Sequence, residues 1–175
     1  MTNDSSRLRD SIPIKSILWD SSWPELSGND ERERLLDYLY NRFGIPSQVL
    51  DDYLFFRRKR AWFLIHNSPQ LAYASRLKIS KAGLRAFQRV GNFIKPTTRF
   101  IQGFGHHATR GVYEVGADQL GALLGGEVIP VDLPLDKGYV ILTYGTNRIL
   151  GLGFFDNHAI RSQLPRKELT LHLTV

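Results

Sequence analysis

The chain has 175 residues, of which 42% are hydrophobic and 23% charged, so a disordered, collagen-like or coiled-coil chain is excluded. It has no cysteine, which excludes disulfides, thiolate nucleophiles, iron–sulfur clusters and cysteine zinc sites. Lysine and arginine number 23 against 17 acidic residues, a formal net charge of +6. Because the N-terminal residues lack the pattern of a signal peptide, we expect a cytoplasmic protein without membrane contact.

The first predicted helix follows a partly ordered extension over residues 1–29. Asp30 and Glu33 have the spacing of a capping box, apolar residues follow at helical spacing, and Gly44 is a stop signal. Ser47 is then expected to cap a second, short helix.

Strand patterns follow the second helix. The apolar run 61–65 predicts a buried strand, and the alternation over 76–80 predicts a half-exposed strand with basic residues on one face. Residues 95–104 look extended, and Pro96 restricts that segment to a sheet edge or a strand start.

The last part of the chain predicts a small antiparallel sheet or barrel. A strand over 108–115 precedes a short helix capped by Asp118, and Gly125 and Gly126 break that helix. Four short strands with glycine- or asparagine-containing turns then follow, at 138–144, 147–155, 158–164 and 168–173.

Charge is distributed unevenly along the chain. From Leu54 to Tyr113 there are 60 residues with 12 basic side chains and no Asp or Glu, which leaves 11 basic against 17 acidic residues elsewhere. Such a stretch favours a polyanionic partner, since phosphate neutralisation releases counterions. A solvated basic surface is the alternative. The run 57–60 alone is typical of a solvated turn.

The basic stretch is interleaved with aromatic residues. Cations can follow a phosphate backbone while rings stack on unpaired bases, as on many RNA-binding surfaces. Most of these rings are nevertheless expected in the core, so the charges carry more of the prediction than the rings.

No motif predicts catalysis. Residues 103–108 fit G-x-G-x-x-A but lack the preceding strand and following helix of a dinucleotide site. His106 and His107 would point to opposite faces of a strand and could not share a metal ion. No pair of carboxylates has a spacing that suggests acid–base chemistry. We therefore predict no catalytic residue, no metal and no cofactor.

The segment from Gly103 onward resembles a PUA-like RNA-binding domain. The resemblance is closest to the domain appended to rRNA cytosine-5 methyltransferases, and an upstream module similar to 35–64 accompanies that domain in small stand-alone proteins, so that the resemblance spans roughly residues 31–170. The motifs that carry it are Gly105–Arg110 (GHHATR), Leu120–Gly126 (LGALLGG), Lys137–Val140 (KGYV), Leu150–Gly153 (LGLG) and Ser162–Arg166 (SQLPR).

The resemblance implies a β-barrel that binds structured RNA in a groove beside a glycine-rich helix–strand connection. Glycines allow close approach of a phosphate backbone, and nearby cations hold it. Methyltransferase activity is not implied here, because the chain has no cysteine and no room for the S-adenosylmethionine fold. Carried over to this sequence, the groove would involve Thr109, Arg110, Gly125, Gly126, Lys137, Gly138 and Arg166.

Taken together, the sequence predicts an α+β protein with a mixed α/β module at 30–104, bearing a basic face, and a PUA-like β-barrel at 105–175. We expect it to bind rRNA or tRNA as a non-catalytic accessory in RNA modification or ribosome assembly, with a modification enzyme or the ribosome as a further partner. Two alternatives stay open: an RNA-processing enzyme using His106 or His107, and an adaptor for an acidic protein. Besides the groove, the expected RNA contacts are Arg76, Lys78, Lys81, Arg85, Arg89, Lys95, Arg99 and His107.

Overall fold

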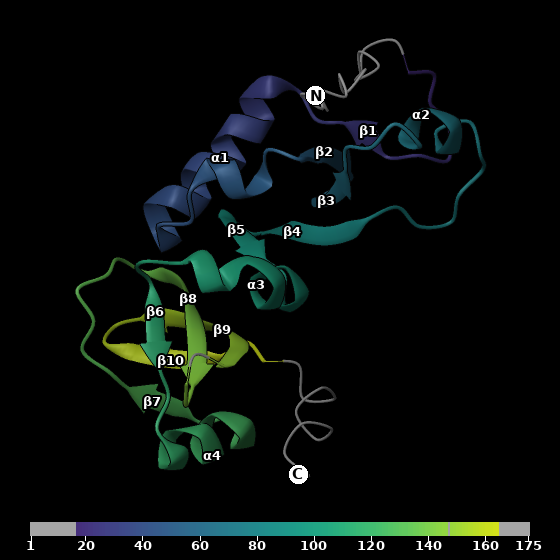
Figure 1. The fold of residues 1–175 in the computed structure, drawn as a ribbon. Helices are drawn as coiled ribbons and strands as arrows, with labels where there is room; N and C mark the ends of the chain where they lie inside the picture. The colour runs from purple at the N-terminus through teal and green to yellow at the C-terminus, as the bar shows by residue number, and fades with distance from the viewer. Residues whose placement is uncertain (1–16, 147, 165–175) are drawn as a thin grey trace, which may run out of the picture.

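The computed structural model describes residues 17–146 and 148–164, which form two five-stranded sheets with helices packed on and between them (Figure 1). Both helices and strands are well represented, so the α+β class is confirmed. No helix in the described part of the chain is long and apolar enough to cross a membrane. The predicted strand over 168–173 and the predicted contact Arg166 lie outside the described residues.

The first sheet, sheet A, is entirely antiparallel and follows the chain order β1-β2-β3-β4-β5. Helix α1 (Asn29–Phe43) packs its buried residues against one face of this sheet. The five strands are β1 (Glu25–Leu26), β2 (Tyr53–Arg58), β3 (Ala61–His66), β4 (Leu84–Val90) and β5 (Phe93–Pro96).

The second sheet, sheet B, has the order β6-β8-β9-β10-β7 and carries helix α4 (Ala117–Gly125). The antiparallel pairing predicted for the strands at 138–144, 147–155 and 158–164 is confirmed, while β6, from the segment predicted at 108–115, adds to this sheet parallel to β8. The long return through α4 and β7 makes this parallel pair possible. The strands are β6 (Val112–Glu114), β7 (Val128–Pro130), β8 (Gly138–Tyr144), β9 (Arg148–Asp156) and β10 (Ala159–Ser162).

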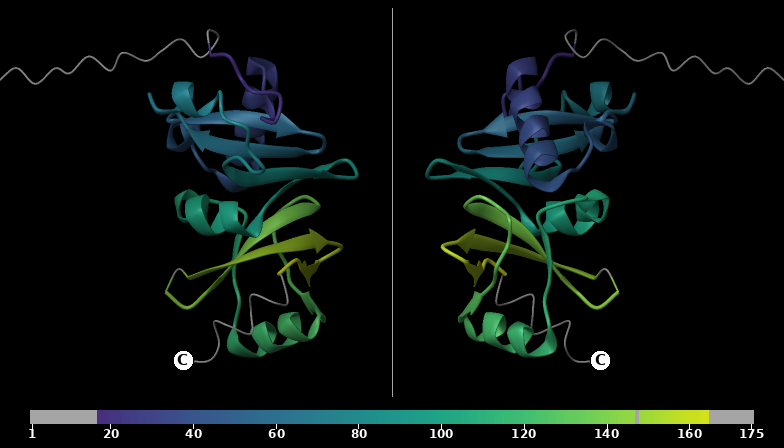
Figure 2. Two further views of the ribbon diagram at one scale, coloured as in Figure 1. Left: turned by 90° about the vertical axis from the view of Figure 1, so that its right-hand side faces the viewer. Right: turned by 90° about the vertical axis from the view of Figure 1, so that its left-hand side faces the viewer.

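One apolar cluster joins the two sheets. Helix α3 (Thr98–Phe104) lies between them in all three views (Figures 1 and 2). Its Phe100 and Ile101 belong to the same buried cluster as Phe43 of α1 and Ile141 of β8. The second cluster lies within sheet B and under α4.

Two helix positions are confirmed, with different caps. Helix α1 ends at Gly44 in the left-handed conformation, as predicted, but begins after Gly28, so Asp30 lies in the first turn instead of at the cap. Helix α4 similarly begins after Gly116 instead of at Asp118. In both cases a carboxylate near the helix start interacts favourably with the helix dipole, which produces a sequence signal resembling a cap.

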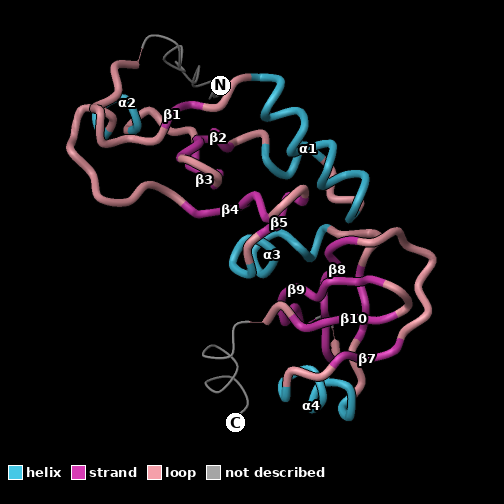
Figure 3. The backbone as a smooth tube through the Cα atoms, turned by 180° about the vertical axis from the view of Figure 1, so that it is seen from behind, coloured by secondary structure: helices cyan, strands magenta, loops and turns pink. Residues whose placement is uncertain are grey.

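The strand predicted over 76–80 is wrong. These residues belong to the long loop between α2 (Leu71–Ala74) and β4, drawn in pink in Figure 3. Their backbone groups bond to the N-terminal segment: Leu77 accepts from the Trp23 indole at 3.0 Å, and Ile79 donates to the Ser22 hydroxyl at 2.8 Å.

The extended segment predicted over 95–104 is half wrong. Strand β5 ends at Pro96, at an edge of sheet A as expected, and Thr97 then caps α3 by accepting from the Phe100 amide. Ser47 likewise begins only a 3-10 turn (Ser47–Leu50), capped by Pro46, before β2 starts.

Candidate nucleic-acid interface

Five cations line one hollow at the tips of two hairpins of sheet A. The hollow has a volume of about 580 Å³ and lies where the β2–β3 and β4–β5 turns meet the start of α1. We call it the cationic cavity; its lining residues are Glu31, Arg34, Arg57, Lys59, Arg60, Trp62, Arg89, Gly91 and Asn92.

Strand register brings these side chains together. Arg57 is paired with Trp62, and Trp62 with Phe87, so all three side chains lie on the face of sheet A that α1 covers. Arg89 follows Phe87 by two residues and faces the same way. Beyond the ends of β2 and β3, Lys59 adopts a positive φ of 57°, which closes the turn.

Most of the positive charge in the cavity is uncompensated. Among the described residues, Glu31 is the one carboxylate in its lining, and it pairs with Arg57 at 3.2 Å. Within residues 17–146 and 148–164, no ion pair or hydrogen bond engages the side chains of the other four cations, Arg34, Lys59, Arg60 and Arg89. The N-terminal end of α1 adds a further partial positive charge. The cavity therefore favours an anion.

Trp62 lines the cavity and carries a buried donor without a partner among the described residues. The residue is 3% exposed, and its indole Nε1 has no hydrogen-bond partner among the described residues. A buried N–H without an acceptor costs free energy.

A second group of cations lies on the opposite face of sheet A. Arg58, Lys81 and Arg85 line a hollow of about 390 Å³ beside Phe63. Two of these cations are held by the protein: Arg58 donates to the Ser22 carbonyl oxygen, and Arg85 donates to Gln88 Oε1 at 2.9 Å. This face is therefore less available to an anion than the cationic cavity.

Part of the groove implied by the resemblance collects at the end of α1. The backbone amides of Thr109 and Arg110 donate to the Phe43 carbonyl at 2.9 and 3.1 Å, and Arg110 lies over the Tyr40 ring. Gly138 lies against the Arg42 guanidinium. Thr109, Arg110 and Gly138 thus meet around the last turn of α1.

The glycine turn lies elsewhere. Gly125 and Gly126 end α4, which lies at the end of the molecule away from sheet A in every orientation (Figures 1 and 2). Thr109 and Arg110, in contrast, contact the C-terminal end of α1, the helix that packs on sheet A. The structure does not bring these two parts of the predicted groove together.

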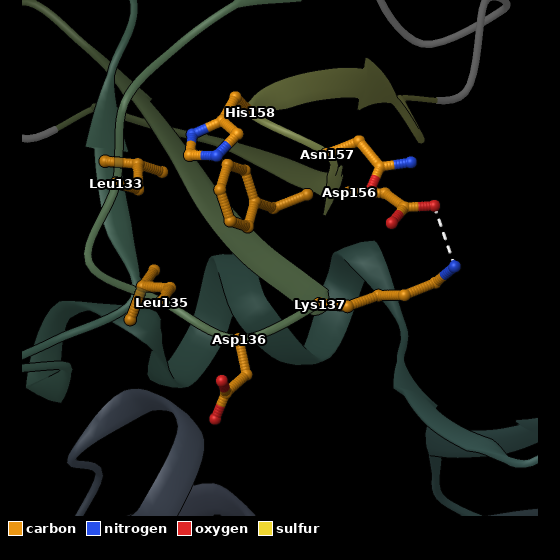
Figure 4. Close-up of a pocket in the computed structure, with 8 residues that line it drawn as sticks. Leu133, Leu135, Asp136, Lys137, Asp156, Asn157 and His158 are labelled. Atoms are coloured by element: carbon orange, nitrogen blue, oxygen red, sulfur yellow. Dashed lines mark ion pairs between the residues drawn. The ribbon is translucent and has the colours of Figure 1, made fainter.

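Lys137 lies in an acidic pocket. Its ammonium group pairs with Asp156 at 2.7 Å, and Asp136 and His158 line the same hollow of about 510 Å³ (Figure 4). His158 in turn lies 3.3 Å from Asp132. The local carboxylates make this pocket a poorer phosphate site than the cationic cavity.

The remaining predicted contacts are dispersed. Arg76 and Lys78 are exposed in the α2–β4 loop, and Arg99 is exposed on α3. Lys95 is half-buried: it donates to Gln163 at 2.8 Å and lies over the Tyr139 ring, and burial lowers its pKa. The basic stretch of the sequence therefore does not form one continuous face.

The two adjacent histidines are exposed and side by side. His106 and His107 belong to a 3-10 turn (Gly105–His107), with ring centroids 3.9 Å apart, so the expectation that they point to opposite faces of a strand is wrong. No group of three or more His, Asp or Glu side chains in the described part of the chain could hold a metal ion.

No protein-family model and no curated protein matches this sequence.

Sequence reasoning missed most of the cavity. Arg89 is among the expected contacts, but the run 57–60 has the pattern of a solvated turn, and Arg34 lies outside the acid-free stretch. The sequence signal that could have located the cavity is the pair of hairpins. The cation-rich β2–β3 turn and the β4–β5 turn that follows Arg89 lie at the same end of the β3–β4 pair, which places their tips together.

Proposed function

We propose that the protein binds RNA and that the cationic cavity holds phosphate groups of its backbone. The observation that carries the proposal is the convergence of five cations and one carboxylate in a single hollow, four of the cations having no partner among the described residues. Arginine and lysine side chains with free donors suit phosphate oxygens.

The resemblance to PUA-like domains favours RNA over other polyanions. It covers roughly residues 31–170, and a helix of sheet B that ends in a glycine turn, α4, supports the proposal. On this proposal the protein is a non-catalytic accessory that brings structured rRNA or tRNA to a modification enzyme or to an assembling ribosome.

The test is binding of fluorescein-labelled tRNA and of a labelled rRNA hairpin, followed by fluorescence anisotropy. We expect the double variant Arg60→Glu/Arg89→Glu to weaken binding by at least about tenfold. The slope of log affinity against log salt should fall by about 1 for each phosphate group that the variant no longer neutralises. Unchanged affinity in this variant would overturn the assignment of the cavity.

A variant of equal charge change serves as the control. Arg110→Glu/Lys137→Glu removes two cations that the resemblance assigns to the RNA groove, and it leaves the cationic cavity intact. We expect its affinity to stay within a factor of about three of the unmodified protein. A greater weakening than in the cavity variant would move the phosphate site to the groove implied by the resemblance, and no RNA binding by the unmodified protein would refute the proposed function.

A further inference from the structure

An exposed aromatic ring adjoins the cationic cavity. Phe93 is 37% exposed, although phenylalanine is normally buried, and it follows directly on Gly91 and Asn92, which line the cavity. Val90, its partner across the β4–β5 hairpin, is 44% exposed. The tip of this hairpin therefore carries a small apolar surface next to a basic one.

The ring of Phe93 packs against two aromatic rings of sheet B. It makes edge-to-face contacts with Phe154 at 5.3 Å and with Tyr139 at 6.4 Å, and these two rings also contact each other. Packing of this kind fixes the orientation of a side chain. A ring that is fixed before binding loses little entropy when a ligand stacks on it.

The two sides of the hairpin tip have complementary chemistry. Arg89 is paired with Ile94 and faces the cavity, whereas Val90 is paired with Phe93 and faces the other way. The Gly91–Asn92 turn alone separates the two sides. A nucleotide chain that crosses this turn would have its phosphate beside Arg89 and its base beside Phe93.

We propose that Phe93 is a stacking platform for an unpaired base of the RNA whose phosphates occupy the cationic cavity. The inference rests on the proposed function and makes it specific: the preferred ligand is a single-stranded stretch, loop or bulge, since a base within a duplex has no free face to offer. Stacking tolerates any base, so the preference is for unpaired over paired RNA, with little dependence on sequence.

The test compares a single-stranded RNA oligonucleotide with a blunt duplex of equal length. Phe93→Ala and Phe93→Leu should each weaken binding of the single strand by about 5- to 100-fold and leave duplex binding within about twofold. Phe93→Tyr should restore single-strand binding. Phe93→Leu keeps an apolar side chain against Phe154 and Tyr139, so it separates loss of the ring from loss of packing.

Tyr73→Ala is the matched control, because this aromatic ring is 78% exposed on α2, outside the lining of the cavity. It should leave binding of both RNAs unchanged. A second readout is an oligonucleotide that carries 2-aminopurine, whose fluorescence should be quenched on binding by the unmodified protein and not by Phe93→Leu.

Two failures are distinguishable. If the protein binds single strands and Phe93→Leu binds them as tightly, with equal quenching, the stacking inference is wrong while RNA binding stands. If neither RNA binds the unmodified protein, the proposed function itself is wrong.

Discussion

The guanidinium of Arg42 donates from Nε to the carbonyl oxygen of Tyr139 at 2.6 Å, which ties the last turn of α1 to the start of β8. Nη1 of the same side chain donates to the Asp136 carbonyl at 2.7 Å. Desolvation lowers the pKa of Arg42, while the neighbouring Tyr38 and Asp136 oppose that shift. This cation therefore serves the joint between the two sheets and is not part of the cationic surface offered to RNA.

Replacing Arg42 should loosen this joint. Hydrogen bonds from a charged donor contribute about 1.5–3 kcal/mol each, and partial exposure of the side chain reduces that value. We expect Arg42→Ala to lower the free energy of unfolding by about 2–3 kcal/mol. Arg42→Lys should recover only part of it, since lysine lacks the planar fork that reaches two carbonyls. Urea unfolding followed by circular dichroism measures both, and equal stability of all three proteins would contradict the role.

Gly111 lies in the same joint and should not tolerate a side chain. Its φ is +63°, and a Cβ atom there would lie 2.6 Å from the Arg42 carbonyl oxygen. Gly111→Ala is therefore expected to cost more than the roughly 1–2 kcal/mol of left-handed strain alone. Gly145 has a similar φ of +58° with nothing within 4 Å, so Gly145→Ala measures that strain by itself. Equal thermal stability of the two variants would refute the close contact.

Tyr38 should make the fold sensitive to alkali. Burial raises the pKa of Tyr38 above its ordinary value of 10.0, and its hydroxyl has no partner among the described residues. Because the unfolded chain loses this proton near pH 10 and the folded chain retains it, stability falls as pH rises above 10. Tyr38→Phe should flatten that decline and leave neutral stability unchanged or higher by up to about 1 kcal/mol. Urea midpoints from pH 7 to 11 provide the measurement, with the exposed Tyr73→Phe as the control.

Glu31 should oppose RNA binding. It is the carboxylate that lines the cationic cavity, and it engages Arg57. Glu31→Gln should tighten RNA binding at low salt, because it removes a negative charge from the cavity. The gain should be only about two- to fivefold, since an ion pair of this kind is worth no more than about 1 kcal/mol. The gain should shrink at high salt. Weaker binding in this variant would indicate that the pair positions Arg57 for the ligand, and no change would count against phosphate binding at this cavity.

Sequence patterns predicted those helices and strands whose ends are set by neighbouring residues in the chain. The apolar spacing and Gly44 located α1, and the turns around Gly145 and Asn157 located the strands of the second sheet. The segment 76–80 resembles a strand because its alternation is real, but its backbone groups bond to Ser22 and Trp23, far away in sequence. Contacts of that kind leave no periodicity in the segment itself.

The charge pattern predicted a basic protein surface but not its layout. The sequence from Leu54 to Tyr113 contains strands, turns and helix α3, which distribute its cations over both faces of sheet A and the joint with sheet B. Arg34 of α1 joins the cavity only because α1 packs across the sheet. Tertiary register therefore decides which cations meet, and charge counted along the chain cannot provide it.

The apolar cluster shared by both sheets also affects how the protein is made. Phe43 and Phe100 are synthesised well before Ile141 and Leu152, yet all four are buried in that one cluster. During synthesis on the ribosome, the apolar surface of the N-terminal half therefore stays exposed to solvent until β8 and β9 emerge. We expect nascent chains stalled before β8 to recruit chaperones, and fragments cut there to aggregate.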